Sequence, residues 1–426
     1  MKKRILSCLM ALALCLSLLP TAALAEEMQD TTPGDTIPAS ESAQEPEVDE
    51  TVEDVRSAID ALPSAEDWAD LTAEEQKTAA EDASAAYEAY EELREEQQTA
   101  LSGELEKLIA LFGKINSEVA PSALGGKGTE DEPYVISNAS DCVTVLSNAY
   151  PDYYLKNKFI KLDADIDLSG QKWNAKTLQN STFDGQGHCI KNAGQPLFSG
   201  LNGATVKNLA IVGAAITGGS GQYAGILANY TSENAVTIQN CYVSGTITGS
   251  YNNGGIGGFI GSVQIATTFT NCAADVTLTN TGSGGVGGFV GQVNATTNMV
   301  NISRCYALGN ATTQSKCAGG FVGAAQFSNT TITIDHSVAL QSEVSNGKNR
   351  YFEGRIAGGT GYFNADNFLN NYAYTDMIGA YQVDKKYAAG GINGSNVSKA
   401  DCTKATFWKD TVGFSGDVWT IEDNKL

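Results

Sequence analysis

Few side chains in this sequence have the types and the spacing that metal binding or catalysis requires. Asp163, Asp165 and Asp167 alternate along a short apolar run, so a strand there would place three carboxylates on one side, which suits Ca²⁺. The run lacks the glycine and the distant bidentate glutamate of a calcium loop. We therefore expect exposed edge charges here, and no metal site.

A second candidate group is the pair Asp184 and His188, which lie in one glycine-rich run. With a serine they would have the composition of a nucleophilic triad, but a triad is defined by geometry, and a turn explains the run without one. Within residues 201–340 the charged side chains do not recur in register; they are Lys207, Glu233, Asp275, Arg304, Lys316 and Asp335. The sequence thus predicts no catalytic residue, no cofactor and no enzyme.

Three tyrosines are the candidate binding residues. Tyr242, Tyr306 and Tyr372 occupy one position of a repeated strand motif, directly after an inward residue, so they should point outward on alternate repeats. Aromatic side chains in such a column can stack against sugars or anchor a protein partner. The alternative is that they support loops crossing the surface, and small or aliphatic residues interrupt the column at Ala210, Ala273 and Val338.

Cys241, Cys272 and Cys305 share another position of the same motif. Stacked neighbours would lie within disulfide reach, but parallel Cβ directions make the required dihedral angle awkward. We expect buried free thiols that act as small apolar side chains.

These positions belong to a repeat whose fourth positions are spaced by 32, 31, 33, 32 and 34 residues. The motif reads VKNLAIVG at Val206, IQNCYVSG at Ile238, FTNCAADV at Phe269, ISRCYALG at Ile302, IDHSVALQ at Ile334 and FLNNYAYT at Phe368. A unit with short strands and no helix cannot bury its own apolar face, so successive units must stack. The sequence predicts a mainly β, parallel β-solenoid with repeats of about 32 residues.

Two local devices should shape each rung. The first, fourth and sixth motif positions are apolar or small and are assigned inward, which requires a bend at the third, held by Asn208, Asn240 and Asn271. Asparagine tolerates the left-handed backbone of such a bend, which predicts an asparagine ladder. A second motif, Gly-Gly-Phe-Val-Gly or its variants, predicts glycines with positive φ or close rung contact, and a stacked column of Phe259, Phe289 and Phe321.

The chain before the solenoid divides into three parts. Residues 1–25 have a basic start, an apolar run and a small-residue end, typical of a cleaved secretory signal. Residues 26–50 are an acidic linker with too few apolar side chains to fold. Residues 51–120 show helical spacing, with a capping box from Thr72 to Glu75, and predict a small three-helix bundle. Residues 121–426 form the solenoid domain.

The charge is concentrated before the solenoid. Residues 26–120 hold 27 acidic and 5 basic side chains, a balance of −22, whereas residues 121–426 hold 22 and 19, a balance of −3. Such a field repels nucleic acid and anionic lipid. No later segment is apolar throughout, so we expect no membrane insertion of the mature chain.

Two segments resemble known families. The helical stretch AIDALPSAEDWADLTAEEQKTAAEDASAAYEAYEEL resembles the helical spacer modules of Gram-positive surface proteins. The GGFIG and GGFVG motifs after an NCY strand look like the GLUG motif of bacterial surface and adhesin-like proteins, a likeness that extends to the flanks GTEDEPYVIS and ATFWKDTVGFSGDVWTIEDNKL. It implies a right-handed, pectin-lyase-like solenoid and carries no catalytic residues to transfer.

Together these observations predict a secreted or cell-surface-associated, non-catalytic binding, adhesion or scaffold protein. Its expected partner is a host or cell-wall glycan or a protein. The alternative is a polysaccharide-degrading solenoid enzyme, a lyase or a glycoside hydrolase, which would need several acids and bases gathered on one face.

Overall fold

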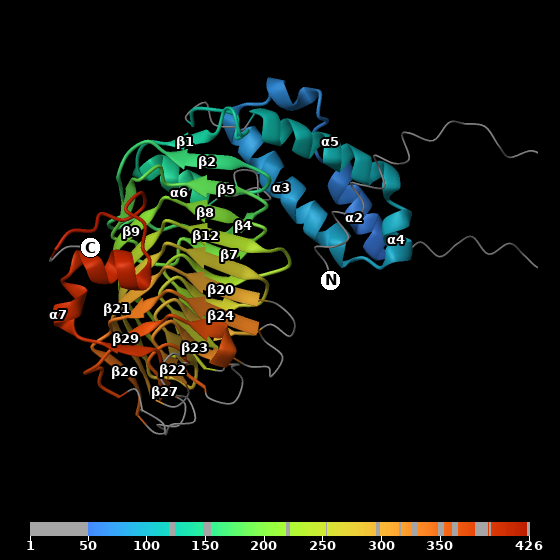
Figure 1. The fold of residues 1–426 in the computed structure, drawn as a ribbon. Coiled ribbons are helices and arrows are strands. Elements are labelled where there is room, and N and C mark those ends of the chain that lie inside the picture. The colour runs from blue at the N-terminus through green and yellow to red at the C-terminus, as the bar shows by residue number, and fades with distance from the viewer. Residues whose placement is uncertain are drawn as a thin grey trace, which may run out of the picture. The chain divides into compact units, whose positions relative to one another are not determined.

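The computed structural model describes residues 50–118, 124–147, 155–218, 222–252, 254–294, 299–314, 317–325, 331–347, 353–359, 365–379, 391 and 393–423. The chain divides into two compact units, residues 1–120 and 121–426 (Figure 1). The predicted signal peptide, residues 1–25, and the predicted linker up to residue 49 lie outside the described residues.

The first unit is helical. Its elements are α2 (Glu50–Asp60), η1 (Asp67–Asp70), α3 (Ala73–Glu92), α4 (Glu95–Thr99) and α5 (Ser102–Glu118). The predicted capping box begins α3: Thr72 Oγ1 accepts from Glu75 N at 3.4 Å, and Glu75 Oε2 accepts from Thr72 N at 2.8 Å. Helices α2, α3 and α5 contact one another. Their buried side chains include Val52, Val55, Ile59, Trp68, Ala83, Tyr90, Leu101, Leu108 and Leu111.

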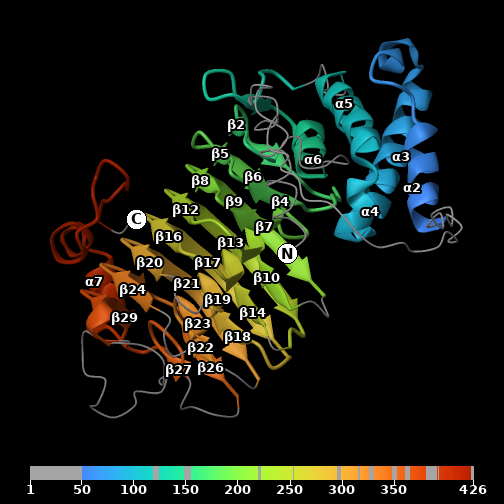
Figure 2. The same cartoon turned by 90° about the vertical axis from the view of Figure 1, so that its right-hand side faces the viewer.

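The second unit is a parallel β-solenoid, which confirms the predicted fold class (Figures 1 and 2). Four sheets run along the stack, and each rung contributes one strand to most of them. The first sheet contains β1 (Tyr134–Ile136), β2 (Phe159–Leu162), β5 (Thr182–Asp184), β8 (Thr205–Lys207), β12 (Val236–Gln239), β16 (Thr267–Thr270), β20 (Met299–Ser303), β24 (Thr331–Asp335) and β28 (Phe368–Leu369). The second contains β3 (Ile166–Asp167), β6 (Cys189–Lys191), β9 (Ala210–Thr217), β13 (Tyr242–Gly249), β17 (Ala273–Asn280), β21 (Tyr306–Thr313), β25 (Val338–Ala339), β29 (Tyr372–Tyr374) and β30 (Ser395–Val397), with β26 (Glu343–Asn346) also paired to β21.

The third and fourth sheets hold the shorter glycine-rich strands. The third contains β10 (Tyr223–Gly225), β14 (Gly255–Gly257), β18 (Gly285–Gly287), β22 (Ala318–Gly319) and β27 (Glu353–Gly354). The fourth contains β4 (Thr177–Gln179), β7 (Phe198–Asn202), β11 (Ala228–Thr231), β15 (Ile260–Val263), β19 (Val290–Val293) and β23 (Val322–Ala325). The remaining elements of this unit are α6 (Ala139–Ser147), η3 (Ala365–Asn367), α7 (Lys399–Cys402) and η5 (Phe407–Val412).

The predicted bend between the first and second sheets is confirmed. All six motif residues at that position have φ between 47° and 56°: Asn208, Asn240, Asn271, Arg304, His336 and Asn370. Asn240 Nδ2 donates to Asn208 Oδ1 at 3.1 Å, and Asn271 Nδ2 donates to Asn240 Oδ1 at 3.2 Å, so the amides form the expected ladder. The left-handed residue turns the chain, and its side chain ties adjacent rungs together.

The Gly-Gly-Phe motif is confirmed, and the structure decides between the two reasons for its glycines. Phe259, Phe289 and Phe321 are fully buried, with ring centroids 4.9 and 5.0 Å apart along the column. Gly288 does not have a positive φ. A Cβ there would clash with the carbonyl oxygen of Gly320 in the next rung, so close backbone approach is the reason for glycine.

The solenoid interior is apolar, as the motif positions predict. Ile238, Cys241 and Val243 are at most 5% exposed. The seven cysteines of the described residues are free, and Cys241, Cys272 and Cys305 are buried, which confirms the expectation for the stacked thiols.

Candidate functional site

The outer side of the second sheet presents a regular polar surface. In β13 and β17, buried Ile247 and Leu278 alternate with outward threonines, because successive side chains of a strand point to opposite faces. The register places Thr246 beside Thr277 and Thr248 beside Thr279. The columns continue to Thr217 in β9 and Thr312 in β21. We call these six threonines, Thr217, Thr246, Thr248, Thr277, Thr279 and Thr312, the hydroxyl face.

Polar groups next to the hydroxyl face extend it. Asp275 is exposed and lies on β17 between Ala273 and Thr277, beside Ser244 of the preceding rung. Asn310 follows Thr277 in the next rung, and Glu343 follows Asn310. A flat array of hydroxyls with a carboxylate and an amide can donate and accept many hydrogen bonds, which suits a hydroxylated ligand.

Sequence reasoning missed this surface, although the sequence contains a signal for it. The triplets Thr-Ile-Thr at 246–248 and Thr-Leu-Thr at 277–279 show the alternation of a strand with one face buried. Threonine also suits exposed strand positions through its β-branched side chain, so the alternation alone predicts a strand and no ligand.

The structure places the three predicted binding residues in one column beside this surface. Tyr242 pairs in register with Ala273, Ala273 with Tyr306, and Tyr306 with Val338, which leads to Tyr372. Tyrosines two rungs apart are thus about 9.6 Å from each other.

The column is not an open platform, because the C-terminal segment covers it. Tyr306 is 9% exposed and its ring centroid lies 5.9 Å from that of Trp408 and 5.5 Å from that of Trp419. The ring of Tyr372 packs on Phe407 at 5.4 Å. Burial raises the pKa of Tyr306 to about 12. The role of these tyrosines in binding a ligand stays a prediction, and at Tyr306 it requires the segment to move.

The first rungs hold a cluster of titratable side chains centred on Asp165. Asp165 Oδ1 accepts from Cys189 N at 3.1 Å and lies 3.5 Å from His188 Nδ1, while its Oδ2 accepts from Lys191 Nζ at 3.0 Å. The hydrogen bond from Cys189 N, followed by that from Lys191, holds the pKa of Asp165 well below its usual range. His188 is therefore paired with Asp165.

The candidate pair of Asp184 and His188, for which a turn is the expected explanation, does not form. Asp184 Oδ1 accepts from Asn208 Nδ2 at 3.0 Å and its Oδ2 lies 3.3 Å from Lys207 Nζ, so it ties the start of the asparagine ladder to the neighbouring rung. Burial, and then Asp165, raises the pKa of the Cys189 thiol, which stays protonated at neutral pH and is a poor nucleophile.

The three alternating aspartates do not converge on one point. Asp167 accepts from Ser169 and from Asn192 Nδ2, whereas Asp165 binds Cys189 and Lys191 and Asp163 is exposed. Within the part of the chain that the structure describes, no group of three or more His, Cys, Asp and Glu side chains is arranged to hold a metal ion.

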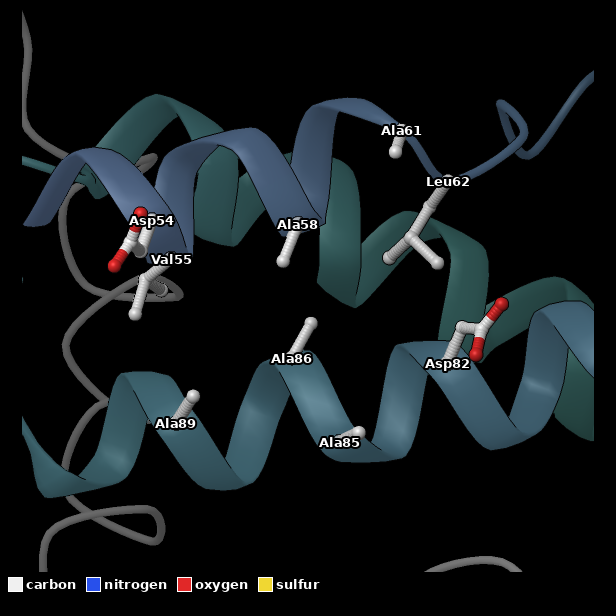
Figure 3. Close-up of a pocket in the computed structure, with 9 residues that line it drawn as sticks. All are labelled: Asp54, Val55, Ala58, Ala61, Leu62, Asp82, Ala85, Ala86 and Ala89. Carbon is white, nitrogen blue, oxygen red and sulfur yellow. The ribbon is translucent and has the colours of Figure 1, made fainter. Parts of the chain in front are cut away.

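The helical unit has a groove of about 400 Å³ between α2 and α3 (Figure 3). Its floor consists mainly of alanine methyl groups, and an aspartate stands at either end; the lining residues are Asp54, Val55, Ala58, Ala61, Leu62, Asp82, Ala85, Ala86 and Ala89. Short side chains on both helices leave this space, and none of them points a nucleophile or a metal ligand set into it.

None of the described helices is both long and apolar enough to cross a membrane.

Comparisons with known proteins support the solenoid. No protein-family model matches the chain. The solved structure of a proposed immunoglobulin A1 protease from Bacteroides ovatus aligns with 67% of this chain and 89% of its own, with a TM-score of 0.53 and 22% identity. A second structure, described as an IgA1 protease, covers 62% of this chain and 21% of its own at a TM-score of 0.42 and 17% identity.

Halomucin of Haloquadratum walsbyi is 28% identical over 35% of this chain. The chain spans 2% of the length of that relative. The aligned part of halomucin therefore represents a small piece of a much longer protein.

The prediction that the chain is not an enzyme is contradicted by the first of these structures, because its solenoid belongs to a chain described as a proposed protease. The prediction relied on the sparse charges of residues 201–340. Residues 201–340 cover the repeats alone, whereas the catalytic residues of an enzyme can lie in loops or in other parts of the protein. At 22% identity the likeness itself establishes the shared fold.

Proposed function

We propose that this chain is an exported, surface-associated binding protein whose hydroxyl face, on the outer side of the second sheet, holds a glycan. One observation supports this more than any other: four threonines of the hydroxyl face stand exposed on three successive rungs, next to Asp275, where the fold requires only a β-branched or polar residue; they are Thr217, Thr246, Thr248 and Thr277. Hydroxyl, carboxylate and amide groups in a flat array match the donors and acceptors of a sugar chain.

The location and the family form part of the same proposal. The signal-type start, the GLUG-like repeat motif and the spacer-like helical segment all favour a protein of the bacterial surface. Halomucin and the proposed immunoglobulin A1 protease, which share parts of this chain's sequence or fold, support that placement. The helical unit would then carry the solenoid away from the surface.

Glycan binding is tested with paired charge substitutions. The double variant Thr246→Lys and Thr277→Lys puts two long cations on the hydroxyl face without touching the core, since both side chains are exposed. We expect binding on a glycan array to fall by about tenfold or more, while the melting temperature falls by only about 2–4 °C because the two cations lie in register on neighbouring strands and repel each other.

The matched control is the double variant Thr237→Lys and Thr268→Lys, which also places two cations in register on neighbouring strands, at half-buried threonines on the outer side of the first sheet. This variant should bind as the wild type does. Equal loss in both variants would mean that general charge, and not the hydroxyl face, decides binding. No saturable glycan binding by the wild type would reject the proposal.

A second candidate is action on immunoglobulin A1, which the shared solenoid favours. Incubation of the chain with immunoglobulin A1 and electrophoresis of the products would show cleavage at a defined site. Intact heavy chains after prolonged incubation would reject it and leave the glycan proposal unaffected.

A further inference from the structure

The C-terminal segment, residues 398–421, folds as a small unit on the outside of the solenoid. We call it the strap. It comprises α7, η5 and the loop to Ile421, and Figure 1 shows it beside β21 and β29. Its apolar side chains pack with the outer side of the second sheet in a cluster separate from the solenoid interior; they are Phe407, Trp408, Val412, Phe414, Trp419 and Ile421.

Among the described residues, the hydrogen bonds of the strap stay within residues 398–423. Ser398 Oγ and Asp401 cap α7, Trp408 Nε1 donates to Cys402 O at 2.8 Å, and Phe414 N donates to Trp408 O at 2.8 Å. Ala405 N donates to Asp423 Oδ1 at 2.9 Å.

Between residues 398–421 and the other described parts of the second sheet there is no hydrogen bond and no ion pair. The strap meets the sheet through rings and aliphatic side chains, and through Lys399, whose Nζ lies 5.2 Å from the ring centroid of Tyr374. Strands β29 and β30, by contrast, are joined by a parallel backbone ladder up to Val397. The change from ladder to side-chain contact occurs at Ser398.

This difference decides how the strap can leave the sheet. Removing a strand from a sheet exposes unpaired backbone groups, whereas lifting the strap breaks apolar contacts and leaves its internal hydrogen bonds intact. Docking also has a polar cost, because Trp419 Nε1 is buried without a hydrogen-bond partner and would regain one in water.

We propose that the tyrosine column and its aliphatic neighbours form an exchangeable docking surface for the strap, on which the strap of a second copy of this chain can replace the resident one. The surface comprises Tyr242, Ala273, Tyr306, Leu308, Val338, Leu340 and Tyr372. A second copy carries the one segment already shown to fit it. The tether at Ser398 gives the resident strap a high effective concentration, so exchange requires many copies close together, as on a cell surface. This proposal does not depend on the glycan site, since the exposed threonines lie outside the covered column.

The test uses the full chain and a fluorescent peptide of residues 398–423. Trp408→Ala removes a ring that touches Tyr306 and should loosen the resident strap, so the labelled peptide should bind this variant about tenfold or more tighter than wild type by fluorescence anisotropy. Val418→Ala is the matched control because Val418 is 42% exposed, and it should behave as wild type. Adding Tyr306→Ala to the Trp408→Ala chain should abolish peptide binding.

The proposal would be overturned if adding Tyr306→Ala left peptide binding unchanged, or if the peptide did not bind a folded Trp408→Ala chain. If the Trp408→Ala chain does not fold, hydrogen exchange of the wild type decides. Amides of Phe407–Val412 should exchange together and faster than those of β17 and β21. Exchange of both groups only in a common global unfolding would mean that the strap is fixed.

Discussion

The side chains at the fourth position of the repeat replace a missing backbone partner at the bend. Cys272 N donates to Cys305 Sγ at 3.3 Å, Cys305 N to Ser337 Oγ at 3.1 Å, and Ser337 N to Asn371 Oδ1 at 3.0 Å. Cys305 Sγ in turn lies 3.2 Å from Ser303 O. Buried amide groups require a partner, so this column selects small side chains that both donate and accept. The sequence suggested a packing role for the thiols; their hydrogen bonding is the additional finding.

This hydrogen bonding predicts that Cys305→Ser is tolerated and Cys305→Ala is not. Serine occupies the next position of the column and makes the same two bonds, whereas alanine leaves the buried Cys272 amide without an acceptor, which costs about 1–3 kcal/mol. Denaturant unfolding of both variants, followed by the signal of the solenoid, measures the difference. Equal stability of the serine and alanine variants would show that the thiol only fills space.

At the Gly-Gly-Phe turn, the backbones of neighbouring rungs of the solenoid lie close together. The sequence predicted this element and its phenylalanine column, because both recur with the period of the repeat. It offered two reasons for glycine, a positive φ and a close contact between rungs, and the structure supports the second: the left-handed conformation occurs at the asparagine bend, while Gly288 is confined by Gly320 O of the next rung.

Gly288→Val should therefore prevent folding or destabilise the solenoid by about 3 kcal/mol or more, since its Cβ would meet backbone that cannot move without breaking the stack. The atoms of the new side chain would also approach Gln341 Nε2, which lies 2.7 Å from an ideal Cβ. The control is Gly194→Val, at a glycine whose Cβ would meet nothing within 4 Å. Thermal unfolding by circular dichroism compares the two. A melting temperature of Gly288→Val equal to that of the control would contradict the close-approach argument.

At the scale of the whole molecule, the repeat made the solenoid predictable and also limited what could be predicted. Stacking follows from the period, so the sheets, the bend and the interior could be derived from residues such as Asn240 and Cys241. The strap has no counterpart in the repeat, and its apolar residues give no indication of which surface they cover. For that reason the tyrosine column could be placed on the outside, with a loop crossing it as one alternative, but the segment that covers it could not be identified.

The carboxylates of the solenoid also predict how it responds to acid. The hydrogen bond from Ser169, followed by that from Asn192, lowers the pKa of Asp167 to about 2, and the hydrogen bond from Ser398 lowers the pKa of Asp401 to about 2. A carboxyl group whose pKa is lower in the folded state stabilises the fold fully above its ordinary value of 3.8, and this contribution is lost as the pH falls through about 2. The folded protein should thus retain most of this stabilisation at pH 4 and lose it between about pH 4 and pH 2.

Asp167→Asn isolates one such contribution. This variant should be less stable than wild type at pH 7, and the difference should shrink as the pH falls from 4 and vanish below about pH 2, where the wild-type carboxyl is protonated as well. The midpoint of denaturant unfolding, measured across this range, gives the comparison. Asp163→Asn is the control because Asp163 is an exposed aspartate of the same rung. A difference between Asp167→Asn and wild type that stays constant down to pH 2 would mean that the lost hydrogen bonds, and not the charge, account for it.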